Sequence, residues 1–402
     1  MAELSFCMVT TYYPPYHFGG DAMYIYRLSN ELARRGHKVT VVHSVDAYKI
    51  LRPPKPTGEF PNEPGVTVRQ VKLGPAAPVA TYLSGRPGLN ARVLDDVFRE
   101  SFDVVHFHNV SLIGGPGVLS YGEGVKLYTT HEHWLVCPMH VLWKNNREPC
   151  LQPECLRCTL AFHRPPQLWR YTGLLERQAR EVDLFLSPSR FTLQAHRDRG
   201  FTRPIRHLPY FLPAEAARSA LAAPELPRPR PYFLFVGRLE RLKGVHVLIE
   251  RFRTYRDADL IIAGAGVHGA QLRRLAAGLD NVHFVGRVHP SALPSLYAGA
   301  VAVLVPSVGF EVFGIVTLEA FAQRSPAIVH DLGALPEPVV DSGGGFVYQT
   351  PDELGEMMAR LQADPDLRGE LGEKGHAGWL RLWSEEPHLE GYFAAIEEAR
   401  AR

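Results

Sequence analysis

The sequence predicts a two-domain α/β protein in which each domain holds a parallel sheet with helices on both faces. Three observations favour this fold class. The chain has 402 residues, more than a single hydrophobic core usually serves. Short β-branched or aromatic runs alternate with helical patterns through both halves, as in repeated βαβ units. A stretch rich in Ala, Pro and Arg, over residues 213–230, separates the halves as a linker would.

These observations set the expected domain boundaries. We expect an N-terminal domain over 1–212, the linker over 213–230, a C-terminal domain over 231–385 and a terminal helix over 386–402, which is a candidate to pack back on the first domain. In the first domain, the run Ala22–Arg35 is apolar at helical spacing and is closed by Gly36. The strands expected there are Leu4–Thr10, Lys38–His43, Asp103–His108, Val125–Thr130 and Asp183–Ser187.

The second half repeats the same rhythm. Its expected strands are Tyr232–Val236, Leu260–Ala263, Val282–Val285, Ala302–Val305, Ala327–Val329 and Gly345–Tyr348. Its expected helices are Val245–Tyr255, Ala270–Ala277, Ser291–Ala298, Ile315–Ala322 and Asp352–Gln362. Strands that alternate with helices in this way indicate a parallel sheet.

Composition narrows the class of protein. Hydrophobic residues make up 46% and charged residues 21%, enough to bury real cores. With 44 basic and 42 acidic residues the net charge is +2, which gives no reason to expect a nucleic acid partner. We find no signal peptide and no run of about 20 apolar residues that would span a bilayer. The predicted location is the cytoplasm, and peripheral association with the inner face of the membrane is the alternative.

Two cations follow the first strand of the second half. Tyr232–Val236 leads into Gly237 and Arg238, and Lys243 comes shortly after. Ligands of open α/β sheets sit at the carboxyl ends of strands, so both side chains should point at a ligand. Arg offers a planar fork to phosphate oxygens and Lys a mobile point charge. Together they suit a diphosphate leaving group.

A second loop, Pro306–Gly314, leads into the helix Ile315–Ala322 and carries the remaining signals. Gly314 and the first free N–H groups of the helix, at Ile315 and Val316, form a natural phosphate seat. Carboxylates repel phosphate but bind sugar hydroxyls well. Glu311 in the loop is therefore a candidate for the transferred sugar, and Glu319 in the helix for the ribose. Each charged residue alone would pass for an ordinary surface charge, but the set together favours a nucleotide-sugar site.

These motifs resemble those of family 4 glycosyltransferases, retaining enzymes with the GT-B architecture. The matching segments are Val236–Leu239 with Lys243-Gly244, and Gly309–Ala320, which includes Phe313. The resemblance implies two Rossmann-like domains facing across a cleft, the first for the acceptor and the second for the donor. It also implies that Arg238 and Lys243 hold the donor phosphates, and that Glu311 and Glu319 contact the sugar and the ribose.

The same resemblance implies the reaction. A sugar moves from a nucleoside-diphosphate donor, most often a UDP sugar, to an acceptor hydroxyl, with the anomeric configuration retained. The leaving phosphate helps to deprotonate the acceptor, so no carboxylate need act as nucleophile and no catalytic metal is required. The resemblance does not define the class of acceptor, which is a glycan, a lipid-linked molecule or a small molecule.

Fewer residues of the first domain carry the resemblance. Gly19 and Gly20 precede a helix, where the backbone can approach an anion, and a Gly-Gly loop in the family closes over the donor diphosphate. His131 follows the strand Val125–Thr130, and the family places a His near the reacting sugar here. The family commonly has Asp next, whereas this chain has Glu132, so only His131 is carried over.

Three glycines favour a rival hypothesis. Gly264-x-Gly266-x-x-Gly269 follows the strand Leu260–Ala263 and reads, taken alone, as a dinucleotide fingerprint. It lies late in its domain, and Arg287 rather than an acid follows the next strand. The resemblance instead implies that Gly264 and Gly266 flank the nucleotide and that Arg287 neighbours the base. An NAD(P)-dependent oxidoreductase and a non-catalytic sugar-nucleotide or glycan-binding protein remain the alternatives.

Two further features lie between the motifs. Four of the 5 cysteines, Cys137, Cys150, Cys155 and Cys158, lie close together in one segment of the sequence. A structural zinc site is one hypothesis for them, and free thiols, reversible disulfides or an iron–sulfur cluster are the alternatives.

The stretch Arg164–Arg180 mixes arginines with aromatic residues. An ordinary amphipathic helix explains it best, and weak contact with a membrane surface or an acidic acceptor is the alternative.

Overall fold

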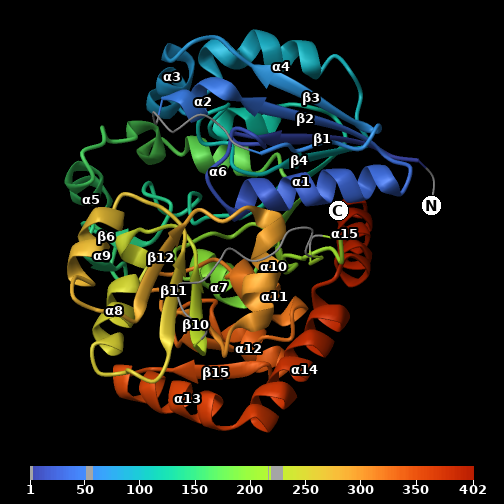
Figure 1. Cartoon of the computed structure of the whole chain (residues 1–402). Coiled ribbons are helices and arrows are strands. Elements are labelled where there is room, and N and C mark those ends of the chain that lie inside the picture. The colour runs from blue at the N-terminus through green and yellow to red at the C-terminus, as the bar shows by residue number, and fades with distance from the viewer. Residues whose placement is uncertain (1–2, 51–57, 216, 219–229) are drawn as a thin grey trace. The chain divides into compact units, whose positions relative to one another are not determined.

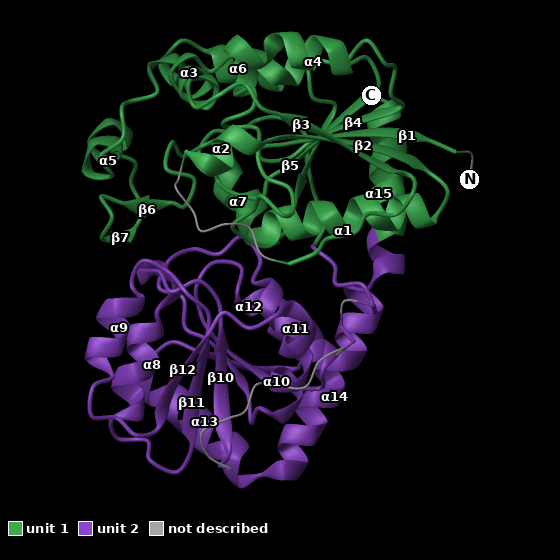
Figure 2. Ribbon diagram, turned by 45° about the horizontal axis from the view of Figure 1, so that its top comes forward, with its two compact units in different colours: residues 1–209, 389–402 green, residues 210–388 purple. Residues whose placement is uncertain are grey.

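A computed structural model of the chain describes residues 3–50, 58–215, 217–218 and 230–402. Figure 2 shows two compact units, unit 1 of residues 1–209 with 389–402 and unit 2 of residues 210–388. The boundary expected at 212 therefore differs slightly from the division observed. Most of the expected linker 213–230 lies outside the described residues. Of the expected terminal helix 386–402, residues 389–402 group with unit 1.

Unit 1 is built on a seven-stranded sheet whose paired strands are all parallel. In spatial order its strands are β3 (Val66–Val71), β2 (Lys38–Ser44), β1 (Ser5–Thr10), β4 (Val104–Phe107), β5 (Val125–Thr129), β8 (Leu184–Ser187) and β9 (Ile205–His207). The five predicted strands are confirmed, with small shifts at their ends. Chain order reverses between β1 and β4, so the carboxyl ends of these two strands form a switch point at which open α/β sheets bind ligands.

Helices and a small hairpin surround this sheet (Figure 1). They are α1 (Gly20–Arg34), α2 (Val45–Lys49), α3 (Ala76–Ser84), η1 (Gly88–Asn90), α4 (Ala91–Val97), η2 (Pro116–Ser120), α5 (Cys155–Ala161), η3 (Leu168–Tyr171), α6 (Leu174–Ala179), α7 (Arg190–Arg197) and α15 (Glu385–Arg400), with the antiparallel pair β6 (Trp143–Lys144) and β7 (Glu148–Pro149). Helix α1 buries Ala22, Ile25, Leu28 and Leu32 along one side, which is the apolar stripe predicted from its spacing.

Unit 2 has a six-stranded parallel sheet of its own. Its spatial order is β12 (Val282–Gly286), β11 (Asp259–Ala263), β10 (Tyr232–Val236), β13 (Val303–Val305), β14 (Ala327–His330) and β15 (Gly345–Tyr348). Its helices are η4 (Arg241–Lys243), α8 (Val245–Phe252), α9 (Gly269–Leu275), η5 (Pro290–Ala292), α10 (Leu293–Gly299), α11 (Ile315–Ala322), α12 (Pro336–Ser342), α13 (Pro351–Ala363) and α14 (Pro365–Leu382). All six strands and five helices predicted for this half are confirmed. The switch point of this sheet lies between β10 and β13.

Helix α15 returns the chain to unit 1. Tyr392 lies in the unit 1 core, where its hydroxyl is 2.9 Å from His106 Nδ1 and its ring stacks on Phe6 at 6.3 Å between centroids. His37 makes a ring contact with Phe393 at 5.4 Å. The final segment therefore fills part of the interior of unit 1. Among the described helices, none is long and apolar enough to cross a membrane.

Candidate functional site

Two loops meet at the switch point of unit 2, and they carry three of the charged residues predicted for donor binding. One loop follows β10 and contains Arg238 and Lys243, and the other follows β13 and contains Glu311. The N–H groups of Val308 and Gly309 both donate to the Leu242 carbonyl, at 2.8 and 3.2 Å. The hydrogen bonds hold the two loops together, so residues far apart in sequence face one ligand position.

Lys243 and Glu311 form an ion pair at this point. Lys243 Nζ lies 2.6 Å from Glu311 Oε1, and the Ser307 hydroxyl donates to the same oxygen at 2.7 Å. Burial alone would raise the pKa of Glu311, but the charge and hydrogen bond of Lys243, the hydrogen bond of Ser307 and the more distant Arg238 together lower it. The pair therefore lowers the pKa of the Glu311 carboxyl and holds the two side chains together before any ligand arrives.

Arg238 is the more exposed of the two predicted phosphate ligands. Its side chain is 53% exposed and pairs with Glu240 at 2.7 Å. Lys243, by contrast, is only 25% exposed. A rigid ammonium and a solvated guanidinium at neighbouring positions suit a diphosphate, since the guanidinium can leave Glu240 when a stronger anion is present.

The phosphate seat predicted at helix α11 has the expected backbone geometry. Gly314 caps the helix with φ of 88°, a left-handed conformation that favours glycine. The N–H groups of Ile315 and Val316 are in the first turn and have no acceptor within the helix. Phe313 is buried and its ring contacts Tyr210 at 5.3 Å, so its side chain anchors the loop rather than facing a ligand.

Glu319, predicted to bind a ribose, lies one turn into helix α11. Its Oε2 accepts a hydrogen bond from the Tyr297 hydroxyl at 2.7 Å. Tyr297 is on α10 and is almost fully buried. This contact fixes one carboxylate oxygen of Glu319. Sequence reasoning missed both Tyr297 and Ser307: Tyr297 looks like any core aromatic of a helix, whereas Ser307 could have been found from its place directly after a strand.

The Gly264–Gly269 turn packs on the loop that carries Arg238. A Cβ atom on Gly264 would lie 1.9 Å from the Gly237 carbonyl oxygen, and one on Gly266 would lie 2.4 Å from the Leu239 carbonyl oxygen. Two of the three glycines of the apparent dinucleotide fingerprint are thus required by contact between loops. Arg287 is exposed just past β12, an edge strand of the sheet.

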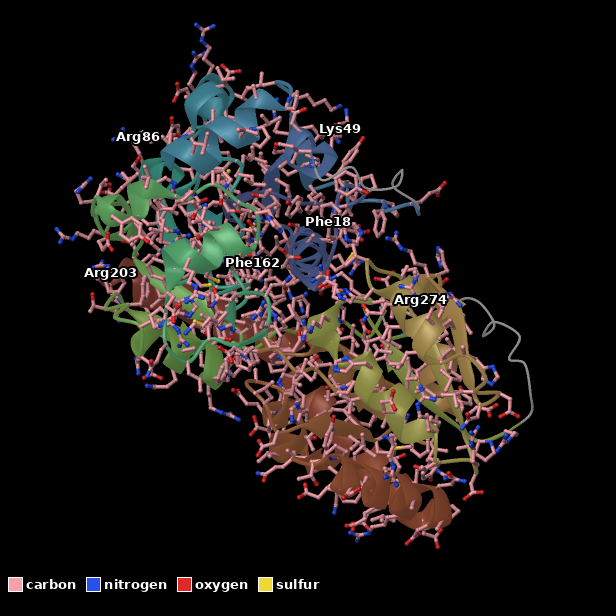
Figure 3. The ribbon with its side chains drawn as sticks, turned by 90° about the vertical axis from the view of Figure 1, so that its left-hand side faces the viewer. Phe18, Lys49, Arg86, Phe162, Arg203 and Arg274 are labelled. Atoms are coloured by element: carbon pink, nitrogen blue, oxygen red, sulfur yellow. The ribbon has the colours of Figure 1, made fainter. Side chains whose placement is uncertain are left out.

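In unit 1, Gly19 and Gly20 begin helix α1 at the switch point. Gly19 is extended, with φ of −157°, and a Cβ atom there would meet only Asp21 Oδ1, at 3.3 Å. The turn itself does not demand glycine, so the absence of a side chain mainly leaves the helix start open to approach. The loop is anchored by Phe18, labelled in Figure 3, which stacks on Tyr48 at 4.7 Å.

His131 follows β5, as predicted, and it is buried. Its Nε2 lies 2.9 Å from His108 Nδ1, and its ring contacts Tyr24 at 5.2 Å. Burial lowers the pKa of His131 to about 3, so the ring is neutral at neutral pH. It can therefore orient a hydroxyl group by hydrogen bonding but does not act as a cation. Glu132 Oε1, at the position where the resemblance leads one to expect Asp, lies 2.7 Å from His140 Nδ1.

The four clustered cysteines surround the β6–β7 hairpin and the start of α5. Cys137, Cys150 and Cys158 are buried, and Cys158 Sγ accepts a hydrogen bond from the Asn145 N–H at 3.3 Å. Burial and then the neighbouring thiol of Cys137 raise the pKa of Cys150 and of Cys155. Within the described part of the chain, no group of three or more His, Cys, Asp or Glu side chains is placed to hold a metal ion. The structure thus gives the predicted zinc site no support.

Two family models match the chain. The model described as glycosyl transferases group 1 matches residues 219–377, and the model described as Glycosyltransferase Family 4 matches residues 18–216. The second match includes Gly19, Gly20 and His131, and the first includes the whole of the Lys243–Glu311 region. Between them the two models match most of each unit, and the segment 389–402 of unit 1 lies outside both matches.

Individual proteins agree with the family models. Alpha-D-kanosaminyltransferase of Streptomyces kanamyceticus is 35% identical over 154 residues, a match that covers 36% of this chain and 39% of that protein. The chain thus matches less than half the length of this relative. Sucrose-phosphate synthase of Thermosynechococcus elongatus superposes with a TM-score of 0.75 at 20% identity and covers 100% of both chains. Anabaena HepE in complex with UDP has a TM-score of 0.67 at 17% identity, covering 98% and 100%. At such identities the two structures demonstrate a shared fold.

Proposed function

The chain belongs to the family 4 glycosyltransferases, enzymes of GT-B fold, and we propose that it moves a sugar from a UDP sugar to an acceptor hydroxyl with retention of the anomeric configuration. The observation that carries the proposal is the Lys243–Glu311 ion pair beside the start of helix α11. A cation, a sugar-binding carboxylate and free backbone N–H groups adjoin at the switch point of one sheet. That combination matches the three parts of a nucleotide sugar.

Each group has a role in this proposal. Arg238 and Lys243 neutralise the diphosphate as the bond to the sugar breaks, together with the N–H groups of Ile315 and Val316. Glu311 accepts hydrogen bonds from hydroxyls of the transferred sugar, and Glu319 from the ribose. The pairing of Lys243 with Glu311 means that the ammonium is positioned in advance, so little reorganisation is needed when negative charge develops on the leaving group.

Charge neutralisation by side chains bears on the need for a metal ion. The two cations and the helix start supply the stabilisation that Mg²⁺ provides in many phosphate-transfer sites. We therefore propose that transfer proceeds without a divalent cation, and that activity in EDTA equals that in Mg²⁺. The departing phosphate itself accepts the proton of the acceptor hydroxyl.

UDP is the proposed nucleotide because HepE, a protein of the same fold, was solved with it. A relative named D-inositol 3-phosphate glycosyltransferase indicates that small hydroxyl-bearing molecules are among the acceptors to be tried. No specific observation favours the oxidoreductase hypothesis, because contacts between loops account for Gly264 and Gly266.

The test is a thermal-shift screen of UDP, GDP, ADP, NAD and their sugar derivatives, followed by incubation of the best donor with candidate acceptors. We expect a UDP sugar to raise the melting temperature most, and the product to keep the anomeric configuration in its NMR coupling constant. Stabilisation by NAD with no response to any nucleoside diphosphate would overturn the proposal. An inverted product would overturn the retaining mechanism alone.

A further inference from the structure

Two buried histidines of unit 1 share one hydrogen bond. His108 follows β4 and His131 follows β5, and these strands are neighbours in the sheet of unit 1 (Figure 2). His108 Nδ1 lies 2.9 Å from His131 Nε2, and the two rings stack with their centroids 5.1 Å apart. A neutral imidazole has one N–H and one bare nitrogen, so one of the two facing nitrogens carries a hydrogen and the other accepts it.

Both rings are neutral at neutral pH. Burial lowers the pKa of His131 to about 3, and burial, followed by the charges of His106 and His131, lowers the pKa of His108 well below its ordinary range. The hydrogen bond therefore joins two neutral rings. Its direction depends only on which tautomer each ring adopts, and the tautomer decides what the outer nitrogen of each ring can do.

The second nitrogen of His108 favours one direction for the bond. Its Nε2 is buried and has no hydrogen-bond partner among the described residues. If His131 donated to His108, the single hydrogen of His108 would be on Nε2, and a buried N–H would have no acceptor. If His108 donates, only a lone pair is left unpaired at Nε2. Buried N–H groups without a partner are rarer in proteins than unpaired acceptors, so His108 is favoured as the donor.

The next histidine on β4 holds the His108 ring without fixing its hydrogen. The ring centroid of His106 lies 3.9 Å from that of His108, and Tyr392 of α15 stacks on His106 at 5.4 Å. The two nitrogens of His106 face hydroxyl groups, Tyr392 Oη at 2.9 Å and Thr129 Oγ1 at 2.8 Å. A hydroxyl can donate or accept, so either tautomer of His106 is satisfied. The direction of the bond is therefore set by His108 and His131 alone.

We propose that His108 is a positioning residue whose Nδ1–H donates to His131 Nε2 and so fixes His131 as the tautomer with its hydrogen on Nδ1. Any oxygen that His131 Nδ1 meets, in the chain or in a ligand, then meets a donor and must accept. A sugar hydroxyl in that position keeps its own hydrogen for another acceptor. The effect on sugar transfer rests on the proposed function, whereas the tautomer of His131 does not.

The test is NMR of the chain labelled with ¹⁵N at histidine, without any ligand. The chain has 18 histidines, and the signals of His131 are those that disappear in His131→Asn. In long-range ¹H–¹⁵N spectra a ring nitrogen that carries a hydrogen resonates well upfield of a bare one. We expect Nδ1 of His131 to be of the N–H type and Nε2 to be bare. An N–H signal from His131 Nε2 in the parent chain overturns the proposal.

Two substitutions of His108 separate its hydrogen bond from its packing. His108→Asn keeps a donor, because the amide nitrogen takes the place of Nδ1 and can only donate, so His131 should stay in the same tautomer. His108→Leu fills the interior without a donor, and both tautomers of His131 should appear. We expect kcat/KM for sugar transfer to fall about tenfold in His108→Leu, the effect of losing one neutral hydrogen bond, and to stay near the parent value in His108→Asn.

His43→Leu is the matched control. His43 is likewise buried near the carboxyl end of a strand of this sheet, β2, and neither of its ring nitrogens has a partner among the described residues. The substitution removes a buried imidazole but not the His108–His131 bond, so the signals of His131 should not change. A change as large as that in His108→Leu would show that the tautomer responds to any loss of packing, and would overturn the role of His108.

The outcomes for the tautomer and for the function are distinguishable. If His108→Leu does not fold, as its melting temperature shows, the spectra of the parent chain and of His108→Asn still decide the tautomer. Equal spectra of His131 in folded His108→Leu and His108→Asn contradict the positioning role. A chain with its hydrogen on His131 Nδ1 that transfers no sugar contradicts the proposed function and leaves the tautomer as inferred.

Discussion

Lys243 and Glu311 form an ion pair within a partly buried site. The ammonium lowers the pKa of the carboxyl, and the carboxylate fixes the position of the ammonium. The carboxylate would be protonated more easily if it were buried without the ammonium. The ammonium, held at 2.6 Å from Glu311 Oε1, gives up little conformational freedom when a diphosphate arrives. Removing either partner therefore changes both the charge and the geometry of the site.

We expect Lys243→Ala to lower kcat/KM for sugar transfer by about 10²- to 10³-fold, the effect of removing one group that stabilises developing negative charge. The variant should also lose activity at a higher pH on the acid side than the parent. Lys243 keeps the pKa of Glu311 low, so without it the carboxylate is protonated earlier as the pH falls. Initial rates across pH measure both effects.

Lys374→Ala is the matched control, because Lys374 Nζ pairs with Glu370 at 2.6 Å and both side chains are exposed. Such surface pairs contribute little. Parent-like kcat/KM in Lys243→Ala would remove Lys243 from the mechanism. Arg238→Ala tests the second cation in the same assay.

At the scale of elements, the two loops of the candidate site in unit 2 are held by glycines that permit close backbone contact. A Cβ atom on Gly264 would lie 1.9 Å from the Gly237 carbonyl oxygen, and one on Gly244 would lie 1.9 Å from the Pro306 carbonyl oxygen. Both glycines also have positive φ, of 150° and 69°. The loop that carries Arg238 and Lys243 is thus fixed at both ends by contacts that no other residue allows.

Gly264→Ala should therefore destabilise unit 2 by about 1–3 kcal/mol and weaken donor binding, because the methyl group displaces the Gly237 turn. Gly269→Ala lies in the same motif, and its new Cβ would meet only Leu239 Cδ1 at an ordinary 3.5 Å. Chemical denaturation and UDP titration of both variants measure the difference. A larger loss of stability and UDP binding in Gly269→Ala than in Gly264→Ala would contradict this account. It would mean that the glycine motif itself, rather than the contact between loops, is needed for stability and binding.

The elements that sequence reasoning predicted best are the buried ones. Strands such as β1 and β10 are almost continuous apolar runs because both faces of a parallel sheet are covered. The strands of the unit 1 sheet that it missed, β3 and β9, lie at the two edges, where β3 is half exposed and β9 is very short, and it also missed the short hairpin of β6 and β7. Helix α14 was also missed, since its glycines at helical positions weaken the pattern.

The candidate site divides in the same way. Arg238, Lys243, Glu311 and Glu319 could be predicted because they follow strands or begin a helix in a recognisable pattern. The hydrogen bonds of Tyr297 and His108 could not, because each joins segments that only the folded chain brings together. The thiols show the opposite case, since closeness in sequence did not produce a metal-binding arrangement among the described residues.

Across the whole molecule, the buried histidines are unevenly distributed. Burial lowers the pKa of His43 to about 4, of His131 to about 3 and of His196 to about 4, and it lowers the pKa values of His108 and His133 well below the ordinary range. All five belong to unit 1. The folded state of unit 1 thus excludes protons that its unfolded state would take up.

Unit 1 should therefore lose stability as the pH falls from about 6.5 towards 4. In that window the unfolded histidines bind protons and the folded ones do not, so the free energy of unfolding decreases by up to about 1.4 kcal/mol per pH unit for each histidine. Hydrogen exchange measured by mass spectrometry at pH 7 and pH 5, corrected for the intrinsic rates, separates the units. Equal loss of protection in unit 2 peptides would contradict this account.

Residues 389–402 complete a unit that the chain began before it made unit 2. During translation, the segment 210–388 is therefore synthesised as an insertion, and it can fold while its host still lacks Tyr392 and Phe393. Until these side chains arrive, His106 and Phe6 face an unfilled interior. Unit 1 is thus synthesised as two separate segments of the chain. A chaperone that binds the nascent chain between them would meet the first 209 residues before unit 1 can complete its fold.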